Sequence, residues 1–329
     1  MRVVMTGGGG FLGQKLARAI LEKGTLNGPD DQPAKVTELV LADMVTLTPE
    51  PSDGVLVTSA KVDVSDAKSM SELITPDTAS VIHLAAVVSA QAEADFDLGM
   101  RVNLDGTRTL LEACRALDHA PRFLTTSSVA VFGGDLPDAI PDDHAPTPGN
   151  SYGAQKAIGE LLVGDYSRKG FVDGRVIRLP TVVVRPGKPN AAASSFASSI
   201  VREPMQGEEA ICPVEAGMPI WIMSPRAAIK NLIHAHDLPA DIVAKGRTLI
   251  PPGLTVTIGE IVEALDRAGG EEAIQHLKWE PDLNIINIVG GWPGGFESVR
   301  GRELGFQSDA SIDAIIQAFV EDDMVTHEE

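Results

Sequence analysis

The sequence predicts a doubly wound α/β fold, in which helices cover both faces of a parallel sheet, with a smaller C-terminal lobe. Short apolar, β-branched segments alternate with longer segments of helical periodicity over the first 184 residues. A glycine-rich turn joins the first such pair, and the alternation stops near residue 185, where "RPGKPNAAASSFASS" begins. Repeated β-α-β succession gives parallel strands with right-handed crossovers, which is the basis of this prediction.

The elements follow in order along the chain. The short apolar runs predict strands at Arg2–Thr6, Glu38–Asp43, Val55–Val64, Ser80–Ala86, Arg122–Ser128 and Arg175–Val184. Helical periodicity predicts helices at Phe11–Lys23, Ala67–Ile74, Met100–Leu117 and Ser151–Lys169. The polar segment "GTLNGPDDQPAK" is expected to be a loop inserted before the second strand. The final "EDDMVTHEE" is expected to be a frayed acidic terminus.

Composition excludes several classes of function. A net charge of −19 would be repelled by phosphates, so we expect no nucleic-acid partner. The two cysteines, Cys114 and Cys212, lack metal-ligand spacing, and the histidines are scattered, so no metal site is expected. No run is apolar and long enough to span a membrane, and the first strand starts too early for a signal peptide. We therefore expect a cytoplasmic protein.

The glycine-rich turn is the first candidate site. Gly7, Gly10 and Gly13 form G-x-x-G-x-x-G directly after a strand and at the start of a helix. Such a turn lets a pyrophosphate approach the backbone, and the helix amino end supplies free N–H groups. A P-loop would need Lys and then Ser or Thr after its last glycine, whereas Gln14 and Lys15 follow Gly13. The alternative is a glycine turn that merely packs the helix closely on the strand.

A dinucleotide site also needs an acid at the end of the second strand. Asp43, in "LVLAD", is in that position, 30 residues after Gly13, and the inserted loop explains the long spacing. A carboxylate there would repel the extra phosphate of NADP, so the cofactor expected is NAD. The alternative for Asp43 is a solvated charge at a strand end. Asp63, after the third strand, is a candidate for holding the adenine amino group.

A second candidate site lies in "SYGAQKAIGE". Tyr152 and Lys156 are four residues apart, so they share one face of the expected helix. A neighbouring ammonium would lower the pKa of a phenol and make Tyr152 a proton acceptor for a substrate hydroxyl. Upstream, "TTSSVAVFGG" places two serines at a strand end, where a hydroxyl could bind the reacting oxygen. Without these partners, Tyr-x-x-x-Lys would be read as an amphipathic helix.

These motifs together resemble the extended branch of the short-chain dehydrogenase/reductase superfamily, with its Rossmann-type fold. "TGGGGFLG", "VDVSD", "HLAA", "NLDGT", "TSSVAVFG", "YGAQK" and "RLPT" occur in the family's order over most of residues 1–190. The resemblance implies that Tyr152 is the catalytic acid/base and that Lys156 also holds the nicotinamide ribose. It places the substrate-polarising hydroxyl at Ser128, with Ser127 as the alternative, and puts Asn103 near the lysine and a water chain.

The resemblance also implies which residues bind the cofactor. The expected set is Gly7, Gly10, Phe11, Leu12, Gly13, Asp43, Asp63, Val64, Leu84, Ala85, Ala86, Asn103, Tyr152, Lys156, Pro180 and Thr181. One departure is Phe132, where many sugar-nucleotide enzymes of the family have Tyr. The resemblance divides the chain into an NAD-binding domain (1–184, with a returning segment at about 224–252) and a substrate-binding lobe (185–223 and 253–329).

The second half of the chain narrows the resemblance. "GFVDGRVIRLPTVVVRPGKPNAAASSFASSIVREP" and "IWIMSPRAAIKNLIHA" look like the D-erythronate dehydrogenase group, which oxidises the C2 hydroxyl of a four-carbon sugar acid with NAD. An acid substrate needs a bidentate donor, for which an arginine is best suited. The substrate residues expected are Ser127, Ser128, Tyr152, Arg185, Asn190, Ser194, Ser195 and Arg226. Family members commonly pair two helices across a dimer, so a homodimer is expected.

Alternatives on the same fold remain open at this stage. A nucleotide-sugar epimerase with tightly held NAD, or a uronate-type sugar dehydrogenase, would use the same Tyr and Lys. A dehydratase would need an acid pair after the serine, where Val129 and Ala130 stand. A non-enzymatic NAD sensor would have no need of Ser128, Tyr152 and Lys156 together. The sequence leaves open which sugar acid is preferred, whether C2 or C3 reacts, the direction, and which arginine binds the carboxylate.

Overall fold

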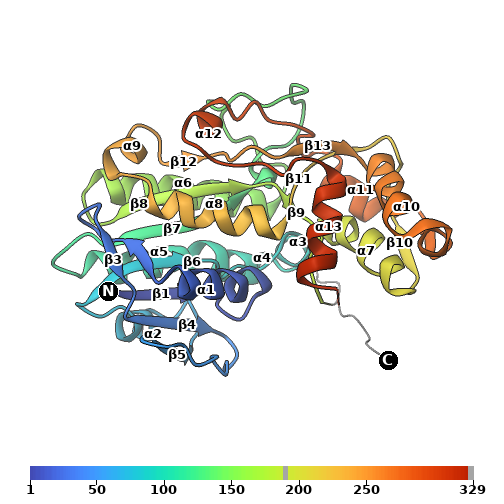
Figure 1. The fold of residues 1–329 in the computed structure, drawn as a ribbon. Coiled ribbons are helices and arrows are strands. Elements are labelled where there is room, and N and C mark those ends of the chain that lie inside the picture. Colours follow the sequence, from blue (N-terminus) through green and yellow to red (C-terminus); the bar gives the residue numbers. More distant parts are fainter. Residues whose placement is uncertain (188–191, 325–329) are drawn as a thin grey trace.

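A computed structural model describes residues 1–187 and 192–324. Its centre is a seven-stranded sheet in the order β12-β8-β7-β6-β1-β4-β5, and every neighbouring pair in it is parallel (Figure 1). β1 stands between β4 and β6, so the strand order reverses there and the crossovers diverge on the two sides. A ligand crevice is expected at such a reversal, outside the carboxyl ends of the strands. The doubly wound fold is confirmed.

The strands of this sheet are short and their central residues are buried. Their bounds are β1 Arg2–Thr6, β4 Glu38–Asp43, β5 Leu56–Lys61, β6 Thr78–His83, β7 Arg122–Ser128, β8 Asp173–Leu179 and β12 Thr248–Leu249. The other strands are β2 Thr25–Asn27, β3 Pro33–Lys35, β9 Thr181–Val182, β10 Ala210–Cys212, β11 Pro219–Met223, β13 Leu254–Thr257 and β14 Leu277–Trp279.

Helices cover both faces of the sheet. On one face α1 and α8 bury Leu16, Ile20 and Leu232 against the strands. On the other face α2, α5 and α6 bury Leu110 and Val163, among others. The helices are α1 Phe11–Lys23, α2 Ala67–Leu73, α3 Ser89–Ala94, α4 Phe96–Gly99, α5 Gly106–Arg115, α6 Ser151–Arg168, α7 Phe196–Arg202, α8 Pro225–Asp237, α9 Ala240–Ala244, α10 Ile258–Ile274, α11 Leu283–Val289, α12 Val299–Glu303 and α13 Ile312–Asp322.

A separate hydrophobic core lies among the C-terminal helices. Helices α7, α10, α11 and α13 gather at one end of the central sheet (Figure 1). Their apolar side chains, including Phe196, Ile261, Leu265 and Phe319, bury one another there with residues of β11. A three-stranded sheet, in the order β13-β11-β9, borders this core.

The strand expected at 175–184 is two strands. β8 ends at Leu179, and β9 begins at Thr181 and pairs with Ile222 and Met223 of β11 in the three-stranded sheet. Pro180, between them, has no backbone N–H to donate to a continuing ladder. The chain therefore leaves the central sheet at this proline.

Two other expectations need correction. The segment expected to be a loop before the second strand contains a hairpin of β2 and β3, whose Leu26 is buried. The helix expected at 100–117 continues a helix that begins at Phe96, and its first turns, Met100–Asp105, are a π-helix. The tightly packed contacts of Asn103, described below, accompany this widened turn, as is common at functional sites.

The acidic C-terminal segment was expected to be frayed, but its described part, as far as residue 324, is held by ion pairs. Asp323 forms an ion pair with Lys15 of α1, at 2.6 Å. Asp322 and Glu321 pair with Arg226 of α8, at 2.5 Å and 2.9 Å. These pairs hold the end of α13 against the two helices on one face of the sheet. Residues 325–329 lie outside the described part of the chain.

Both thiols of the chain lie in the protein interior. Cys114 and Cys212 are both buried and neither is in a disulfide, and burial raises the pKa of the Cys114 thiol to about 12. Neither is therefore poised to react. Among residues 1–187 and 192–324, no helix combines the length and apolar character needed to cross a bilayer.

A buried histidine makes stability depend on pH. Burial, with a contribution from Lys156, lowers the pKa of His83 to about 3, and its ring bonds Thr6 Oγ1 at 2.7 Å and Thr107 Oγ1 at 3.1 Å. The unfolded state, with a histidine pKa of about 6.5, binds more protons between pH 6.5 and 3, so stability falls as pH falls through that window. We expect a contribution on the order of 5 kcal/mol across it.

Urea unfolding of the wild type and of His83→Gln between pH 7 and pH 4.5 checks this. The free energy of unfolding of the variant is expected to be lower at pH 7 and to decline less steeply with acid. Equal slopes for the two proteins would contradict the assignment. Part of the slope should persist in the variant, because burial also lowers the pKa of His236.

Candidate active site

A cavity of about 330 Å³ opens at the carboxyl ends of the central strands. Glycines from one side of the sheet and the Tyr-Lys helix from the other side both reach it. Of the residues expected to bind cofactor or substrate, it is lined by Gly7, Gly10, Phe11, Leu12, Gly13, Leu84, Ala86, Ser127, Ser128, Tyr152, Lys156, Pro180, Thr181, Arg185 and Ser194. Asp43, Asp63, Val64, Ala85, Asn103, Ser195 and Arg226 do not line it, and Asn190 lies outside the described residues.

The glycine turn fits closely against its surroundings. Gly7 has φ +74°, and a Cβ there would lie 2.6 Å from the backbone nitrogen of Ala85. A Cβ on Gly13 would lie 2.3 Å from the carbonyl oxygen of Gly7. Helix α1 has no side-chain cap and no acidic residue in its first turn. Its amino end therefore presents N–H groups and positive potential to the cavity, which suits the pyrophosphate of NAD.

Asp43 stands beside this turn at the end of β4. Its carboxylate accepts a hydrogen bond from the backbone N–H of Gly9, at 2.9 Å. This position, next to the glycines and outside the cavity itself, fits the end of a dinucleotide distant from the reacting carbon. Asp63 instead bonds the backbone and hydroxyl of Ser65, at 2.9 Å and 2.7 Å, and Val64 packs against Gly106. The carboxylate of Asp63 is thus engaged in a local turn.

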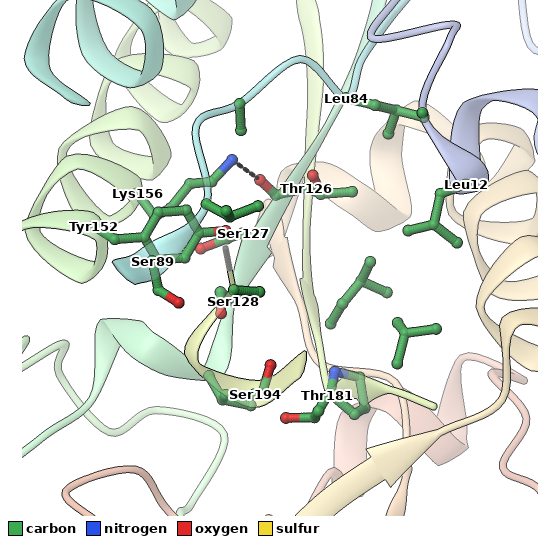
Figure 2. Close-up of a pocket in the computed structure, with 18 of the residues that line it drawn as sticks. Leu12, Leu84, Ser89, Thr126, Ser127, Ser128, Tyr152, Lys156, Thr181 and Ser194 are labelled. Atoms are coloured by element: carbon green, nitrogen blue, oxygen red, sulfur yellow. Dashed lines mark hydrogen bonds between the residues drawn. The ribbon is translucent and has the colours of Figure 1, made fainter. Parts of the chain in front are cut away.

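Tyr152 and Lys156 share the cavity-facing side of α6. The helix begins after Asn150, whose side chain accepts from the N–H of Gly153 at 2.8 Å. A Cβ on Gly153 would lie 1.9 Å from the carbonyl oxygen of Ala130, so the helix can approach the end of β7 only because this residue is glycine. Lys156 Nζ lies 5.7 Å from the centroid of the Tyr152 ring and donates to the carbonyl oxygen of Thr126 at 2.9 Å (Figure 2).

The pKa of the phenol differs from the expectation. Burial raises the pKa of Tyr152 to about 12, and the charge of Arg185 and a hydrogen bond with Ser128 lower it by less. Burial lowers the pKa of Lys156 to about 8, against a raising effect of Glu160. The charge of Arg185 thus favours the Tyr152 phenolate in this structure. The Lys156 ammonium is directed to a carbonyl oxygen.

The two serines at the end of β7 differ in their bonding. Ser128 caps a short 3-10 turn, accepting from the N–H of Ala130 at 3.2 Å, and also bonds Tyr152. Ser127 is buried, and its Oγ has no hydrogen-bond partner within the described part of the chain. Figure 2 shows both serines between the Tyr152–Lys156 pair and the opposite wall at Leu12 and Leu84. A ligand oxygen in the cavity could bond either hydroxyl.

Asn103 acts behind the cavity wall. Its side chain exchanges two hydrogen bonds with the backbone of Val87, at 2.8 Å and 3.0 Å, and donates to Gln155 Oε1 at 2.8 Å. Gln155 lies on α6 between Tyr152 and Lys156 in the sequence. Asn103 therefore ties the chain segment after β6 to α6, and both its amide oxygen and its amide nitrogen take part in these hydrogen bonds. Among the described residues its side chain bonds Val87 and Gln155, and it is linked to Lys156 through α6.

The two candidate arginines are in different environments. Arg185 lines the cavity, donates from Nε to the carbonyl oxygen of Val182 at 2.9 Å, and bonds Ser194 Oγ at 3.2 Å. Arg226 is held outside it by Asp322 and Glu321, as described above. The structure therefore brings only Arg185 to the site, and the substrate role expected for Arg226 is not supported by its position. Ser195 follows Ser194 in a 3-10 turn without facing the cavity.

Sequence reasoning missed part of the wall. Ser89, at the start of α3, lines the cavity, and its hydroxyl accepts from the N–H of Ala193 at 3.1 Å. Thr126 contributes the carbonyl that orients Lys156. Trp292, in the loop after α11, closes another part of the cavity. The only signal for Trp292 was a bulky aromatic in the glycine-rich run "GGWPGG". Further missed residues at the wall are Val88, Val129, Leu179, Val182 and Ala192.

Within the described residues, no three His, Cys, Asp or Glu side chains are grouped as a metal site. The polar groups that do converge are hydroxyls, an ammonium and a guanidinium. This set can hold and deprotonate a hydroxyl and bind an anion. Together with the glycine cradle, it fits an NAD-dependent reaction at a carbon that carries a hydroxyl.

Comparison with known proteins agrees with this geometry. The model of the NAD dependent epimerase/dehydratase family matches residues 3–244. The D-erythronate dehydrogenase of Cupriavidus necator is 54% identical to this chain over 98% of each. The D-erythronate dehydrogenase of Haemophilus influenzae is 44% identical, over 98% of this chain and 100% of that protein.

Solved structures share the fold over almost the whole chain. The structure described as the nucleoside-diphosphate-sugar epimerase from Agrobacterium tumefaciens has a TM-score of 0.90 and 43% identity, covering 98% of this chain and 94% of that one. The L-threonine 3-dehydrogenase from Trypanosoma brucei, at 22% identity, has a TM-score of 0.83 over 97% and 96% of the two chains, which shows the fold alone. The chain belongs to the NAD dependent epimerase/dehydratase family, the extended short-chain dehydrogenases/reductases, and is an NAD-dependent dehydrogenase.

Proposed function

We propose that the enzyme oxidises the C2 hydroxyl of a four-carbon sugar acid, converting D-erythronate to 2-keto-D-erythronate with NAD. The observation that carries the proposal is the convergence of Ser128, Tyr152, Lys156 and Arg185 on one cavity beside the glycine cradle. The serine, tyrosine and lysine supply the groups needed to oxidise a hydroxyl, and Arg185 supplies a cation that can bind the carboxylate of an acid. The two relatives named D-erythronate dehydrogenase support this choice of substrate.

The chain's own residues handle the proton. Ser128, already hydrogen-bonded to Tyr152, holds the substrate oxygen next to the phenol. Tyr152, in its phenolate form, accepts the hydroxyl proton, and the positive charge of Arg185 favours that form. Lys156, fixed by the Thr126 carbonyl, stays beside the Tyr152 ring and is the group that would hold the nicotinamide ribose. The chemistry that NAD supplies when bound is acceptance of the hydride from the same carbon.

Arg185 is the carboxylate-binding residue in this proposal. A planar guanidinium can bind a carboxylate through two parallel hydrogen bonds. The contacts to Val182 and Ser194 fix one side of the guanidinium and so orient it in advance. Burial lowers the pKa of Arg185 to about 10, which leaves it charged at neutral pH. A bound carboxylate would compensate this partly desolvated cation.

Replacing Arg185 by methionine is expected to raise KM for the acid by about 10- to 100-fold, because the substrate carboxylate loses a charge-assisted hydrogen bond. NAD affinity should be unchanged. Since the charge of Arg185 lowers the pKa of Tyr152, the variant should contain less phenolate at each pH, and its kcat should be lower across the alkaline range. Initial rates between pH 7 and pH 10.5 measure both effects.

Arg226→Met is the matched control, because that arginine lies outside the cavity in surface ion pairs. It should keep the KM and the pH profile of the wild type. If Arg226→Met raised KM and Arg185→Met did not, the two arginines would exchange roles and the position of the carboxylate would be wrong.

The reaction itself is tested by the absorbance of reduced nicotinamide with a panel of acids. The panel contains D-erythronate, L-threonate and a uronic acid, with NADP and a nucleotide sugar as contrasts. Stoichiometric reduction of NAD by D-erythronate, and identification of a 2-keto product, supports the proposal. A 3-keto product would correct the reacting carbon, and oxidation of the uronic acid alone would favour a uronate dehydrogenase.

A nucleotide-sugar epimerase is the second candidate, because the 43%-identical structure is described as one. An epimerase returns the hydride to its substrate and shows no net NAD reduction. Interconversion of a nucleotide sugar, with no oxidation of any acid in the panel, would make this candidate the better one.

Three further properties complete the proposal. We place the enzyme in the cytoplasm, which is supported by two buried thiols that form no disulfide. We propose a homodimer through α6, where Ile158 and Leu161 are exposed at 40% and 75%.

We assign NAD binding to residues 1–184 and about 224–252, and substrate binding to 185–223 and 253–329. The return of β12 to the central sheet and the separate C-terminal core support this division.

A further inference from the structure

The active-site cavity has a small neighbour beyond its wall. The second cavity measures about 10 Å³, which is room for about one water molecule. The two cavities have three lining residues in common, Val129, Thr181 and Trp292. These residues therefore form the partition between them, and Trp292 is by far the largest of the three.

Trp292 is placed at this partition by the end of α11. Its backbone N–H donates to the carbonyl oxygen of Val289 at 3.0 Å, continuing the last turn of the helix. Trp292 packs against a small buried cluster of Trp221, Ile250 and Val129, the residue that directly follows Ser128. The partition thus begins one residue away from the hydroxyl that would hold the reacting oxygen.

The indole also carries an unsatisfied polar atom. Nε1 of Trp292 is buried, with no hydrogen-bond partner in the described part of the chain. Buried donors without partners are uncommon in folded proteins. A tryptophan that served only to fill the core would be replaceable by phenylalanine without this unsatisfied donor. Packing alone therefore does not explain a tryptophan at this position.

We infer that Trp292 is a specificity-determining residue that limits the length of the acid substrate. The inference rests on the proposed function, since it concerns the chain of carbons beyond C3 of the acid. With Trp292 in place, this end of the cavity is closed by the ring. Without the ring, the active-site cavity is continuous with the space bordered by Met218, Ile220 and Val289.

The lining of that second space predicts which longer acids would bind better once the ring is removed. Met218, Ile220 and Val289 are apolar, so the opened extension would favour an apolar tail over a hydroxylated one. Burial of one methylene corresponds to about a fourfold gain in binding. An acid with two additional methylenes should therefore gain on the order of tenfold relative to the four-carbon acid.

The test compares D-erythronate with erythro-2,3-dihydroxyhexanoate, which has the same head and an apolar tail, and with the hydroxylated five-carbon acid D-ribonate. The ratio of kcat/KM for the dihydroxyhexanoate to that for D-erythronate is expected to rise about tenfold or more in Trp292→Ala, with a smaller rise for D-ribonate. Trp292→Phe keeps an aromatic ring at the partition and should retain the wild-type ratio. Trp279→Ala, at a half-exposed tryptophan of β14, is the control and should also retain it.

The outcomes separate this inference from the proposed function. If the wild type oxidises D-erythronate, and the ratio of kcat/KM for the dihydroxyhexanoate to that for D-erythronate is the same in Trp292→Ala as in the wild type, the inference alone is overturned. Failure of the wild type to oxidise any acid overturns the proposed function, and the inference with it. Trp292→Leu, which keeps an apolar side chain for the C-terminal core, gives the same comparison if the alanine variant unfolds. A rise in the ratio with leucine supports the inference, and an unchanged ratio contradicts it.

Discussion

Tyr152→Phe is expected to lower kcat for the oxidation by on the order of 1000-fold, because general acid–base catalysis contributes about that much. Phenylalanine keeps the ring that Lys156 faces, so the cavity and the helix should be unchanged. NAD affinity should stay within about twofold, since the change removes only the proton acceptor. Steady-state kinetics and calorimetric titration with NAD measure the two quantities.

The chain offers a matched control for this change. It contains two tyrosines, and the other, Tyr166, hydrogen-bonds Glu112 away from the cavity. Tyr166→Phe should therefore retain the wild-type kcat. If Tyr152→Phe kept more than about a tenth of the wild-type rate, another group would have to be the proton acceptor.

Gly13→Ala is expected to have the second largest effect, on cofactor binding. The new Cβ would lie 2.3 Å from the carbonyl oxygen of Gly7 and 2.9 Å from Cα of Gly8, so the backbone of the turn must move. Such overpacking costs about 3 kcal/mol. Since the displaced atoms form the cradle itself, we expect NAD affinity to fall at least about 100-fold, a loss of about 2.7 kcal/mol.

Gly164→Ala supplies the comparison, because Gly164 is also a helical glycine. A Cβ there would meet no atom within 4 Å. The substitution should raise the free energy of unfolding by about 0.5–1 kcal/mol and leave NAD binding unchanged. Thermal unfolding and NAD titration of both variants provide the test. Wild-type NAD affinity in Gly13→Ala would show that this turn is not the cofactor cradle.

The parts of the fold that depend on local pattern were predictable. The central strands are continuous apolar runs because helices cover both of their faces, and that pattern is visible in the sequence. The glycine turn and the Tyr152–Lys156 pair are each encoded within about ten residues. The structure places the glycines and this pair around one cavity, as parallel strands with a shared carboxyl edge require.

The features that were missed depend on distant partners. The strand after Pro180 joins Ile222 and Met223, some forty residues further on, and nothing near residue 180 specifies that pairing. The hairpin of β2 and β3 is held by Arg122, which bonds Asp31, and by Asp237, which accepts from the N–H of Asn27. These residues are 91 and 210 positions away from their partners.

The same limit applies to the site. The sequence could not show which of Arg185 and Arg226 lies at the site. Arg226 is held away from the cavity by ion pairs with Glu321 and Asp322, which are nearly a hundred residues further along the chain. The raised pKa of Tyr152 was not predicted for a related reason. Lys156 is visible as a neighbour in sequence, whereas the burial that raises the pKa comes from the whole cavity wall.

The return of the chain to the central sheet has a consequence for synthesis on the ribosome. Helix α8 and β12 complete one face and one edge of the sheet, and Leu232, Leu238 and Leu249 belong to the core under that face. A nascent chain that has emerged only to residue 184 has the glycine cradle and the Tyr-Lys helix but lacks this cover. Folding of the sheet must therefore wait for residue 249, by which time much of the C-terminal core has also emerged. The two cores are expected to form late and together, and an excised N-terminal half would aggregate through its uncovered face.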